Sequence, residues 1–386
     1  MSHPSASLAA ASAIFSLALS GLALASAQGD STPRSSSTLA ALSTSLDNPP
    51  NRFAYAPLAA ELGKLIESAP ALPGARILQV RTLIRAGDRS AARAELSALQ
   101  PLAEDLPLIE RQRVAIAAAN LDGDPAREIE LMQQLAKLQP GDRWIHYDIA
   151  RAYGEIEDYP AVVRWVREAL ALTGPGDIWE GSWIHYLHSK ALFRLGQFDA
   201  ATTAAAAGRD EATTWRSTLY RMVLGQFGAG ARAEAQTSLD EYLRYAREEG
   251  RTPEALIQFN IGVLFHELGD LATAERYLRA GLAMKPEDKY GTWALAYVLI
   301  DQPQGLAEGT QLLERALLAA PSDRNLLEAR GWAAYRAGGY TDAQRWMQRA
   351  RAAGGGWDQR LQDHATAVDA AASDASLPPA PRTPWL

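Results

Sequence analysis

The stretch that decides the fold is Ala255–Asp288, which reads ALIQFNIGVLFHELGDLATAERYLRAGLAMKPED. Apolar residues recur at helical spacing as far as His266, and Gly269 and Asp270 then break the pattern. A second amphipathic segment covers Ala272–Met284, and a proline shortly after it stops the helix. This stretch therefore predicts two helices joined by a tight turn.

Related units recur in both directions with a period of about 34 residues. Eight units follow from this period: Pro73–Leu106, Ile109–Asp142, Arg143–Gly176, Ser182–Trp215, Thr214–Arg247, Ala255–Asp288, Tyr290–Asp323 and Arg324–Trp357. Small insertions are expected near Asp177–Gly181 and Glu248–Glu254. Stacked units share one linear core, which explains a chain longer than the roughly 250–300 residues of a single compact core.

Composition favours the same helical architecture. Alanine supplies 74 of the 386 residues, whereas Val and Ile together supply 24, and this balance suits helices rather than sheets. Small residues are expected where the two helices of a unit cross. Three close pairs are predicted: Gly262 with Ala274, Gly331 with Ala343, and Gly309 with Tyr297. In the less regular unit, Thr214–Arg247, Gly228 is expected in the turn and Ala233 at the crossing.

Gly262, Phe265, Gly269, Ala274 and Pro286 stand where a known repeat has a small residue, an aromatic residue, the turn glycine, alanine and the closing proline. On these positions the sequence resembles the tetratricopeptide repeat family over Pro73–Trp357. The resemblance implies an all-α fold, a right-handed α-solenoid of about eight stacked repeats that binds or scaffolds other proteins. The last two units, from Trp293 to Arg349, look like repeats common in bacterial envelope proteins.

The segments outside the repeats predict an exported protein. Residues 13–27 form an uncharged run of apolar and small residues that ends in Ala25-Ser26-Ala27, a cleavage pattern of secretory signal peptides. An uncleaved anchor or a disordered tail is the alternative. The predicted segments are a signal peptide over 1–27, a disordered spacer over 28–52, an N-terminal capping helix over 53–72, the solenoid over 73–357, a C-terminal capping helix over 358–376 that begins at Asp358, and a Pro-rich tail over 377–386.

Charge and cysteine content exclude several functions. The net charge of −7 and the isoelectric point of about 5.5 disfavour a nucleic-acid partner. The chain has no Cys, so disulfides, thiol catalysis and Cys-ligated metals are excluded, and this composition is compatible with the periplasm or with secretion. After the N-terminal run, no stretch is long and apolar enough for an integral membrane segment.

The sequence offers little catalytic chemistry. Residues 228–233 match a dinucleotide fingerprint but lack the preceding strand, and His266-Glu267 begins a zinc motif whose second histidine position holds Asp270. We therefore predict no catalytic residues, metal or cofactor. His185 and His188, with His146 from the neighbouring repeat, form the site of a rival hypothesis, an enzyme or an enzyme-regulatory subunit. A purely structural or self-assembling spacer is the third alternative.

The best functional candidate is a stripe of aromatic and basic residues on successive first helices. Trp144-Ile145-His146-Tyr147 and Trp183-Ile184-His185-Tyr186 are the same tetrapeptide in the same phase. Since the family resemblance implies that first helices line a concave groove, we predict a groove that binds an extended or helical peptide with acidic groups. Its candidate residues are Arg81, Arg85, Arg113, Trp144, Tyr147, Arg151, Trp183, Tyr186, Lys190 and Arg194.

Some members of the family hold a peptide's terminal carboxylate with Lys and Asn on successive first helices. Asn260 occupies a suitable position, but Thr218 and Met222 stand on the preceding helix where cations are needed. A carboxylate clamp of that kind is not predicted.

Overall fold

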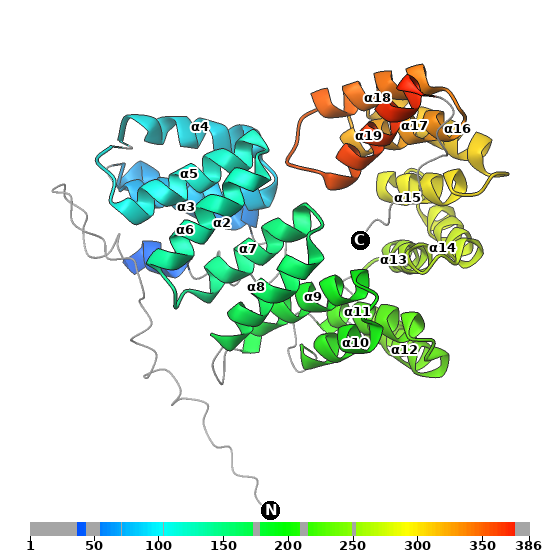
Figure 1. Ribbon diagram of the computed structural model, residues 1–386, viewed down its shortest axis with the longest axis horizontal. Coiled ribbons are helices and arrows are strands. Elements are labelled where there is room, and N and C mark those ends of the chain that lie inside the picture. Colours follow the sequence, from blue (N-terminus) through cyan, green and yellow to red (C-terminus); the bar gives the residue numbers. More distant parts are fainter. Residues whose placement is uncertain are drawn as a thin grey trace, which may run out of the picture. The chain divides into compact units, whose positions relative to one another are not determined.

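The computed structural model describes residues 37–43, 55–70, 72–102, 104–172, 178–208, 215–248 and 252–374, and the elements in these ranges are all helices (Figure 1). The chain divides into two units. Unit 1 comprises Met1–Ala118 and Arg127–His146, and unit 2 comprises Ala119–Ala126 and Tyr147–Leu386. The predicted signal peptide and Pro-rich tail lie outside the described residues.

Every predicted repeat contains two helices. In chain order the repeat helices are α3 (Pro73–Ala86), α4 (Arg89–Leu99), α5 (Leu108–Asp122), α6 (Pro125–Leu138), α7 (Arg143–Glu155), α8 (Tyr159–Ala171), α9 (Ile178–Arg194), α10 (Phe198–Ala207), α11 (Trp215–Gly228), α12 (Arg232–Glu248), α13 (Glu254–Glu267), α14 (Leu271–Met284), α15 (Lys289–Ile300), α16 (Leu306–Ala319), α17 (Arg324–Arg336) and α18 (Tyr340–Ala352). A 3₁₀ turn, η1 (Gln100–Leu102), follows α4. Part of the insertion predicted near Asp177–Gly181 is helical, because α9 begins at Ile178.

Helices also flank the repeats. α2 (Tyr55–Ser68) precedes them and α19 (Gln359–Ser373) follows them. The stretch predicted as a disordered spacer is helical over residues 37–43, where Leu39 and Leu42 are buried in one apolar cluster with residues of α2 and α3. That prediction is therefore wrong for this short segment, since two leucines spaced three apart are enough to dock a short helix.

One residue with positive φ joins the two helices in most repeats. Six turns use glycine, with φ between 72° and 83°: Gly87, Gly123, Gly196, Gly230, Gly269 and Gly338. Glycine fits because it has no Cβ to clash in the left-handed region. Glu157 takes this place in the repeat Arg143–Gly176, with φ 59°. The side chain of the next residue often caps the second helix, as Asp270 does by accepting a hydrogen bond from the Thr273 amide at 3.1 Å.

The register predicted for the repeat Thr214–Arg247 is wrong by two positions. Gly230, not Gly228, has the positive φ, and Ala235, not Ala233, is fully buried. Gly228 is the last residue of α11, where an added Cβ would lie 2.5 Å from the ring of Phe198. The true register keeps the repeat, because Gly230 lies one full period after Gly196.

The helix crossing predicted at Gly262 and Ala274 is confirmed. A Cβ on Gly262 would lie 3.1 Å from the Ala274 carbonyl oxygen, so α13 and α14 do approach closely there. A Cβ on Gly331 would lie 3.0 Å from Met347 and 3.1 Å from Trp346 of α18, so α17 and α18 also approach closely. A Cβ on Gly309 would lie 3.0 Å from the Ala296 carbonyl oxygen, so α15 and α16 approach closely beside Tyr297.

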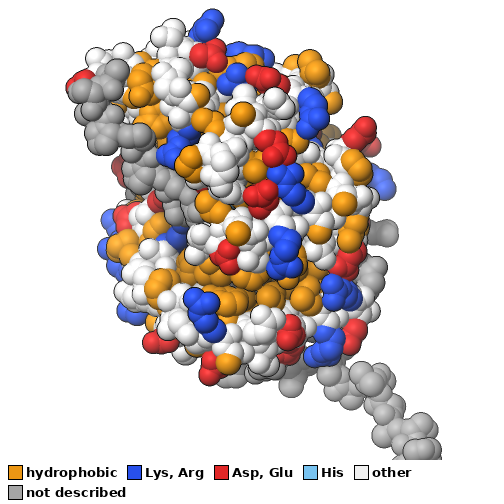
Figure 2. Space-filling view, turned by 90° about the vertical axis from the view of Figure 1, so that its right-hand side faces the viewer, with side chains coloured by type: hydrophobic (Ala, Val, Ile, Leu, Met, Phe, Trp, Pro, Cys, Tyr) orange, Lys and Arg blue, Asp and Glu red, His pale blue; other side chains and the backbone are white. Residues whose placement is uncertain are grey.

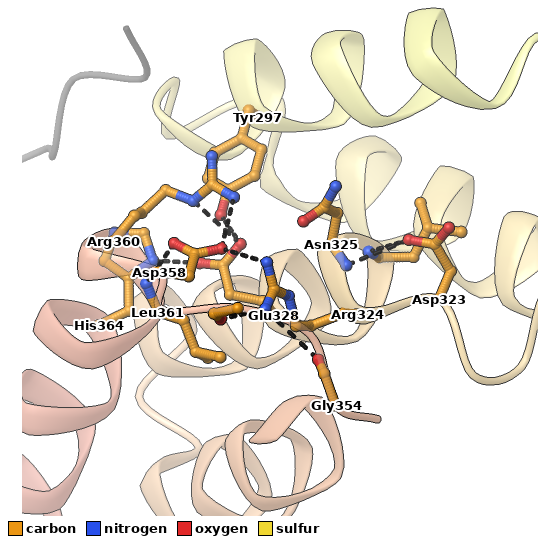
Figure 3. Close-up of polar contacts among 12 residues, drawn as sticks. Tyr297, Asp323, Arg324, Asn325, Glu328, Gly354, Asp358, Arg360, Leu361 and His364 are labelled. Atoms are coloured by element: carbon orange, nitrogen blue, oxygen red, sulfur yellow. Dashed lines mark hydrogen bonds and ion pairs between the residues drawn. The ribbon is translucent and has the colours of Figure 1, made fainter. Parts of the chain in front are cut away.

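The C-terminal helix α19 docks on α17 through both apolar and charged contacts. Leu361, Ala365 and Val368 are buried in the core cluster that α15–α18 contribute to. Figure 3 shows side chains converging on Glu328 of α17, which accepts hydrogen bonds from Tyr297 and His364 and pairs with Arg360 at 3.4 Å. The His364 ring stacks on Trp332 with 3.8 Å between ring centres. Asp358 caps α19 by accepting from the Leu361 amide, as its sequence position predicts.

One face of the molecule carries interleaved charges. Figure 2 shows Lys and Arg side chains next to Asp and Glu side chains, with hydrophobic side chains between them. Arg279 of α14 illustrates the pattern, because it pairs with Glu275 on its own helix and with Glu308 on α16, both at 2.8 Å. Such exposed pairs contribute little each, about 0–1 kcal/mol. Within the described ranges, no helix combines the length and the apolar character needed to span a bilayer.

Candidate functional site

The N-terminal members of the predicted stripe belong to unit 1. Arg81 and Arg85 lie on α3 with partly exposed side chains. Arg113 of α5 donates from Nη2 to Gln139 Oε1 at 3.4 Å. Trp144, at the start of α7, lies next to Arg143, whose guanidinium carbon is 5.9 Å from the indole centre. These contacts of Arg113 and Trp144 are local ones within unit 1.

Arg151 of α7, in unit 2, is occupied by its own helix. It forms an ion pair with Glu155 and lies 3.7 Å from an Asp148 carboxylate oxygen. Tyr147, one turn earlier, packs on the apolar cluster of α7, α8 and α9. Because local carboxylates already neutralise Arg151, this residue is a weaker anion ligand than its position in the sequence suggests.

The α9 members of the stripe come together in unit 2. Trp183 and Tyr186 lie edge to face with 6.4 Å between ring centres. Arg194 extends over the ring of Tyr159 at 5.8 Å and approaches Glu267 of α13, with 3.5 Å between Nη1 and Oε1. Both partners of this ion pair are buried, since their side chains are 8% and 1% exposed.

Arg221 of α11 is the functional candidate that sequence reasoning missed. Arg221 is 1% exposed, and its Nη2 donates a hydrogen bond to the Tyr186 hydroxyl at 3.1 Å. The guanidinium carbon of Arg221 lies 4.8 Å from the centre of the Tyr186 ring. From the sequence, only Thr218 and Met222 were considered on this helix, and Arg221 was not. Tyr220 lies one 34-residue period after Tyr186, and Arg221 follows it directly. Aligning the two repeats on these tyrosines could therefore have identified Arg221.

We call Tyr186, Lys190, Arg194, Arg221 and Glu267 the cationic cluster. Burial, reinforced by Arg221, lowers the pKa of Lys190. Burial alone would raise the pKa of Tyr186, but Arg221 and Lys190 lower it overall. Burial works against the charge of Arg221, yet its contact with Tyr186 raises the pKa of the guanidinium, which stays protonated. The three cations thus act on one another at close range.

Asn260 of α13 lies outside these contacts. Its Nδ2 is 3.5 Å from the Tyr242 hydroxyl of α12, at the limit of a hydrogen bond. Nothing in this geometry pairs Asn260 with a cation on α11.

Two histidines of the rival hypothesis, His185 and His188, have pKa values below the usual one. Burial lowers the pKa of His185, and burial together with Arg167 lowers that of His188 to about 4. His146 belongs to unit 1, where its Nδ1 lies 3.0 Å from the Asp142 carbonyl oxygen. In the part of the chain that the structure describes, no three His, Asp or Glu side chains are grouped to hold a metal ion.

No family model matches the chain. A curated relative, the TPR repeat-containing protein PA4667 of Pseudomonas aeruginosa, is 26% identical to it over 228 residues. This match covers 58% of the chain and 35% of the relative, so the chain spans about a third of that protein's length. The relative carries the repeat that the sequence period predicts.

The chain is similar to a tetratricopeptide repeat protein.

Two solved structures agree with this fold. The apo form of RapI has a TM-score of 0.52 at 11% identity, and the match covers 89% of this chain and 99% of RapI. The apo form of the quorum sensor NprR from B. thuringiensis has a TM-score of 0.51 at 14% identity, with 82% and 98% covered. At such identities the likeness shows the fold alone, and it confirms the prediction of an all-α solenoid.

Proposed function

We propose that this tetratricopeptide repeat protein is an exported scaffold that binds an acidic segment of another protein through its first helices. The observation that carries the proposal is the gathering of Lys190, Arg194 and Arg221 around a single carboxylate, that of Glu267. A chain with a net charge of −7 concentrates positive charge here, which favours an anionic partner. Trp183 and Tyr186 beside the cations supply aromatic contact area.

Affinity capture tests the binding role. The full chain serves as bait for an envelope extract of its own cell, and bound proteins are quantified by mass spectrometry. We expect Lys190→Gln to reduce the captured partner about tenfold, equivalent to about 1.4 kcal/mol. Arg345→Gln is the matched control, because Arg345 is a cation on α18 whose side chain is 71% exposed and pairs with Asp342. If both variants lose the captured partner equally, or if neither loses it, the result would argue against binding at the predicted stripe.

Export is a separate part of the proposal and has its own test. The A-x-A pattern at residues 25–27 supports a mature chain that begins at Gln28. Cell fractionation followed by N-terminal sequencing should recover that residue from the periplasm or the medium. Recovery of the full-length chain from the cytoplasm would contradict export and leave the binding proposal standing.

Self-assembly is the alternative that the same protein preparation can address. Light scattering on the purified chain distinguishes a monomer that captures foreign proteins from an array of identical copies. A concentration-dependent polymer without captured partners would favour the structural spacer.

A further inference from the structure

The cationic cluster carries more positive than negative charge. Lys190 and Arg194 come from α9, Arg221 from α11 and Glu267 from α13. With these four groups ionised, the formal charge of the cluster is plus two. Because Arg221, Arg194 and Glu267 are almost entirely buried, water compensates little of this charge.

Several donors of the cluster point at no acceptor. The Nε and Nη1 of Arg221 and the Nε of Arg194 are buried without a hydrogen-bond partner in the described structure, against one unpaired acceptor, the Oε2 of Glu267. Lys190 has no hydrogen-bond or ion-pair partner among the described residues. Buried guanidinium nitrogens are almost always satisfied in folded proteins, so this number of open donors in one place calls for an anion.

We infer that the cationic cluster is a binding site for a phosphate-like dianion held by Lys190, Arg194 and Arg221.

The chemistry of the cluster favours this class of ligand. A dianion matches a formal charge of plus two, whereas a single carboxylate leaves half of it uncompensated. Guanidinium groups bind the spread oxygens of phosphate through several N–H donors, and Lys adds a compact charge. Tyr186 contributes a further donor, because its hydroxyl oxygen accepts from Arg221 and its own proton is free to bond to the ligand.

The inference rests on the proposed function for its location and extends it by naming the anionic group. Phosphate on a partner protein and free inorganic phosphate share this chemistry. Binding of phosphate is measured without any partner, so its failure and the failure of partner capture are separate results.

Calorimetry on the full chain tests the site. The protein is purified in chloride buffer and titrated with sodium phosphate at pH 8, with sodium acetate and sodium chloride at equal ionic strength for comparison. We expect saturable binding of phosphate, at least about tenfold tighter than of acetate, and about tenfold weaker binding after Arg221→Gln. Arg345→Gln, on the outer surface of α18, should bind phosphate as the wild type does.

Two further variants keep the test decisive if Arg221→Gln fails to fold. Lys190→Gln and Arg194→Gln each remove one cation, and each should weaken phosphate binding while circular dichroism stays unchanged. Absence of saturable binding to the wild type overturns the inference, as does binding that acetate matches or that none of the three variants weakens. In those cases the open donors are satisfied by water alone.

A second arm separates the two sources of phosphate. A phosphoserine peptide is compared with its unphosphorylated form and with inorganic phosphate. Tighter binding of the phosphopeptide than of inorganic phosphate identifies a group carried by a partner, and equal binding identifies free phosphate. Peptide binding that ignores phosphorylation, with no binding of inorganic phosphate, contradicts the site.

Discussion

Glycine residues inside the helices differ in the space around them, and this difference sets the cost of adding a methyl group. A Cβ on Gly262 would lie 2.5 Å from Leu278 Cγ, and Leu278 is fully buried. A Cβ on Gly154, near the end of α7, would meet nothing closer than 3.8 Å. The first position is therefore overpacked by alanine and the second is not.

We expect Gly262→Ala to lower the free energy of unfolding of unit 2 by about 1–3 kcal/mol. Gly154→Ala is the control, and it should be neutral or stabilise by up to about 1 kcal/mol, since alanine is the better helix former. Urea unfolding followed by circular dichroism measures both values. Equal midpoints for the two variants would contradict the close approach of α13 and α14.

Glu328 is a residue whose charge depends on its surroundings. Burial alone would raise its pKa, but Arg360 and His364 hold the pKa below the usual carboxyl value. A carboxyl with a lowered folded pKa stabilises the fold at pH values above its unfolded pKa, about 4.3, and loses that contribution as the pH falls through the folded pKa. Docking of α19 should therefore weaken in acid.

Glu328→Gln tests this dependence. At pH 7 we expect a loss of about 3–5 kcal/mol, because Arg360 and His364 lose a buried charged partner. The variant should also show a smaller change in stability between pH 7 and pH 3 than the wild type. Fluorescence of Trp332, which stacks on His364, reports the docking of α19. Parallel pH curves for wild type and variant would refute the assignment.

At the scale of the element, the second helices of several repeats begin with the same aspartate cap, and α10 is an exception. Asp88, Asp158 and Asp270 each cap a second helix through the side chain. Gln197 stands at the same place before α10 and makes no such bond. The capping carboxylate satisfies an amide that otherwise has no partner in the helix.

Removing an aspartate cap should therefore lower the stability of its helix, and introducing one should raise it. We expect Asp270→Ala to destabilise α14 by about 1 kcal/mol and Gln197→Asp to stabilise α10 by up to about 1 kcal/mol. Hydrogen exchange of the first-turn amides measures each helix separately. Unchanged exchange in α10 after Gln197→Asp would show that the backbone there does not accept a cap.

The paired helices and their turns could be predicted from sequence because they depend on local signals. Period, turn glycine and aspartate cap are all visible in Ala255–Asp288. The register of α11 and α12 was harder, because Gly228 and Ala233 offer the same letters two positions before Gly230 and Ala235. The burial of Ala235 distinguishes the two registers. Burial depends on contacts with neighbouring repeats, which the local sequence pattern does not contain.

The candidate site was less predictable than the helices. The α9 residues Tyr186, Lys190 and Arg194 were found from their phase, and the structure brings them together. Arg221 was not singled out in the sequence, and packing places it against Tyr186. Arg151 was predicted from its phase, and in the structure it pairs with a carboxylate of its own helix. Charge partners come from three-dimensional contacts, which the repeat period does not specify.

At the scale of the whole molecule, the stacked repeats of each unit depend mainly on their neighbours. Val368 of α19 is fully buried against the last repeat. We expect Val368→Asp to speed hydrogen exchange in α17 and α18, since a buried charge separates α19 from them, while α9–α11 keep their protection. Mass spectrometry of exchanged peptides measures this. Uniform loss of protection through unit 2 would contradict nearest-neighbour stability.

The turn at Glu157 has a consequence for engineering the chain. Six other turns have glycine where Glu157 has φ 59°, a conformation that costs a non-glycine residue about 1 kcal/mol. A repeat array spreads such costs, because each turn lies between its own two helices. Replacing Glu157 by glycine should therefore recover this cost in one repeat and leave the other turns unchanged.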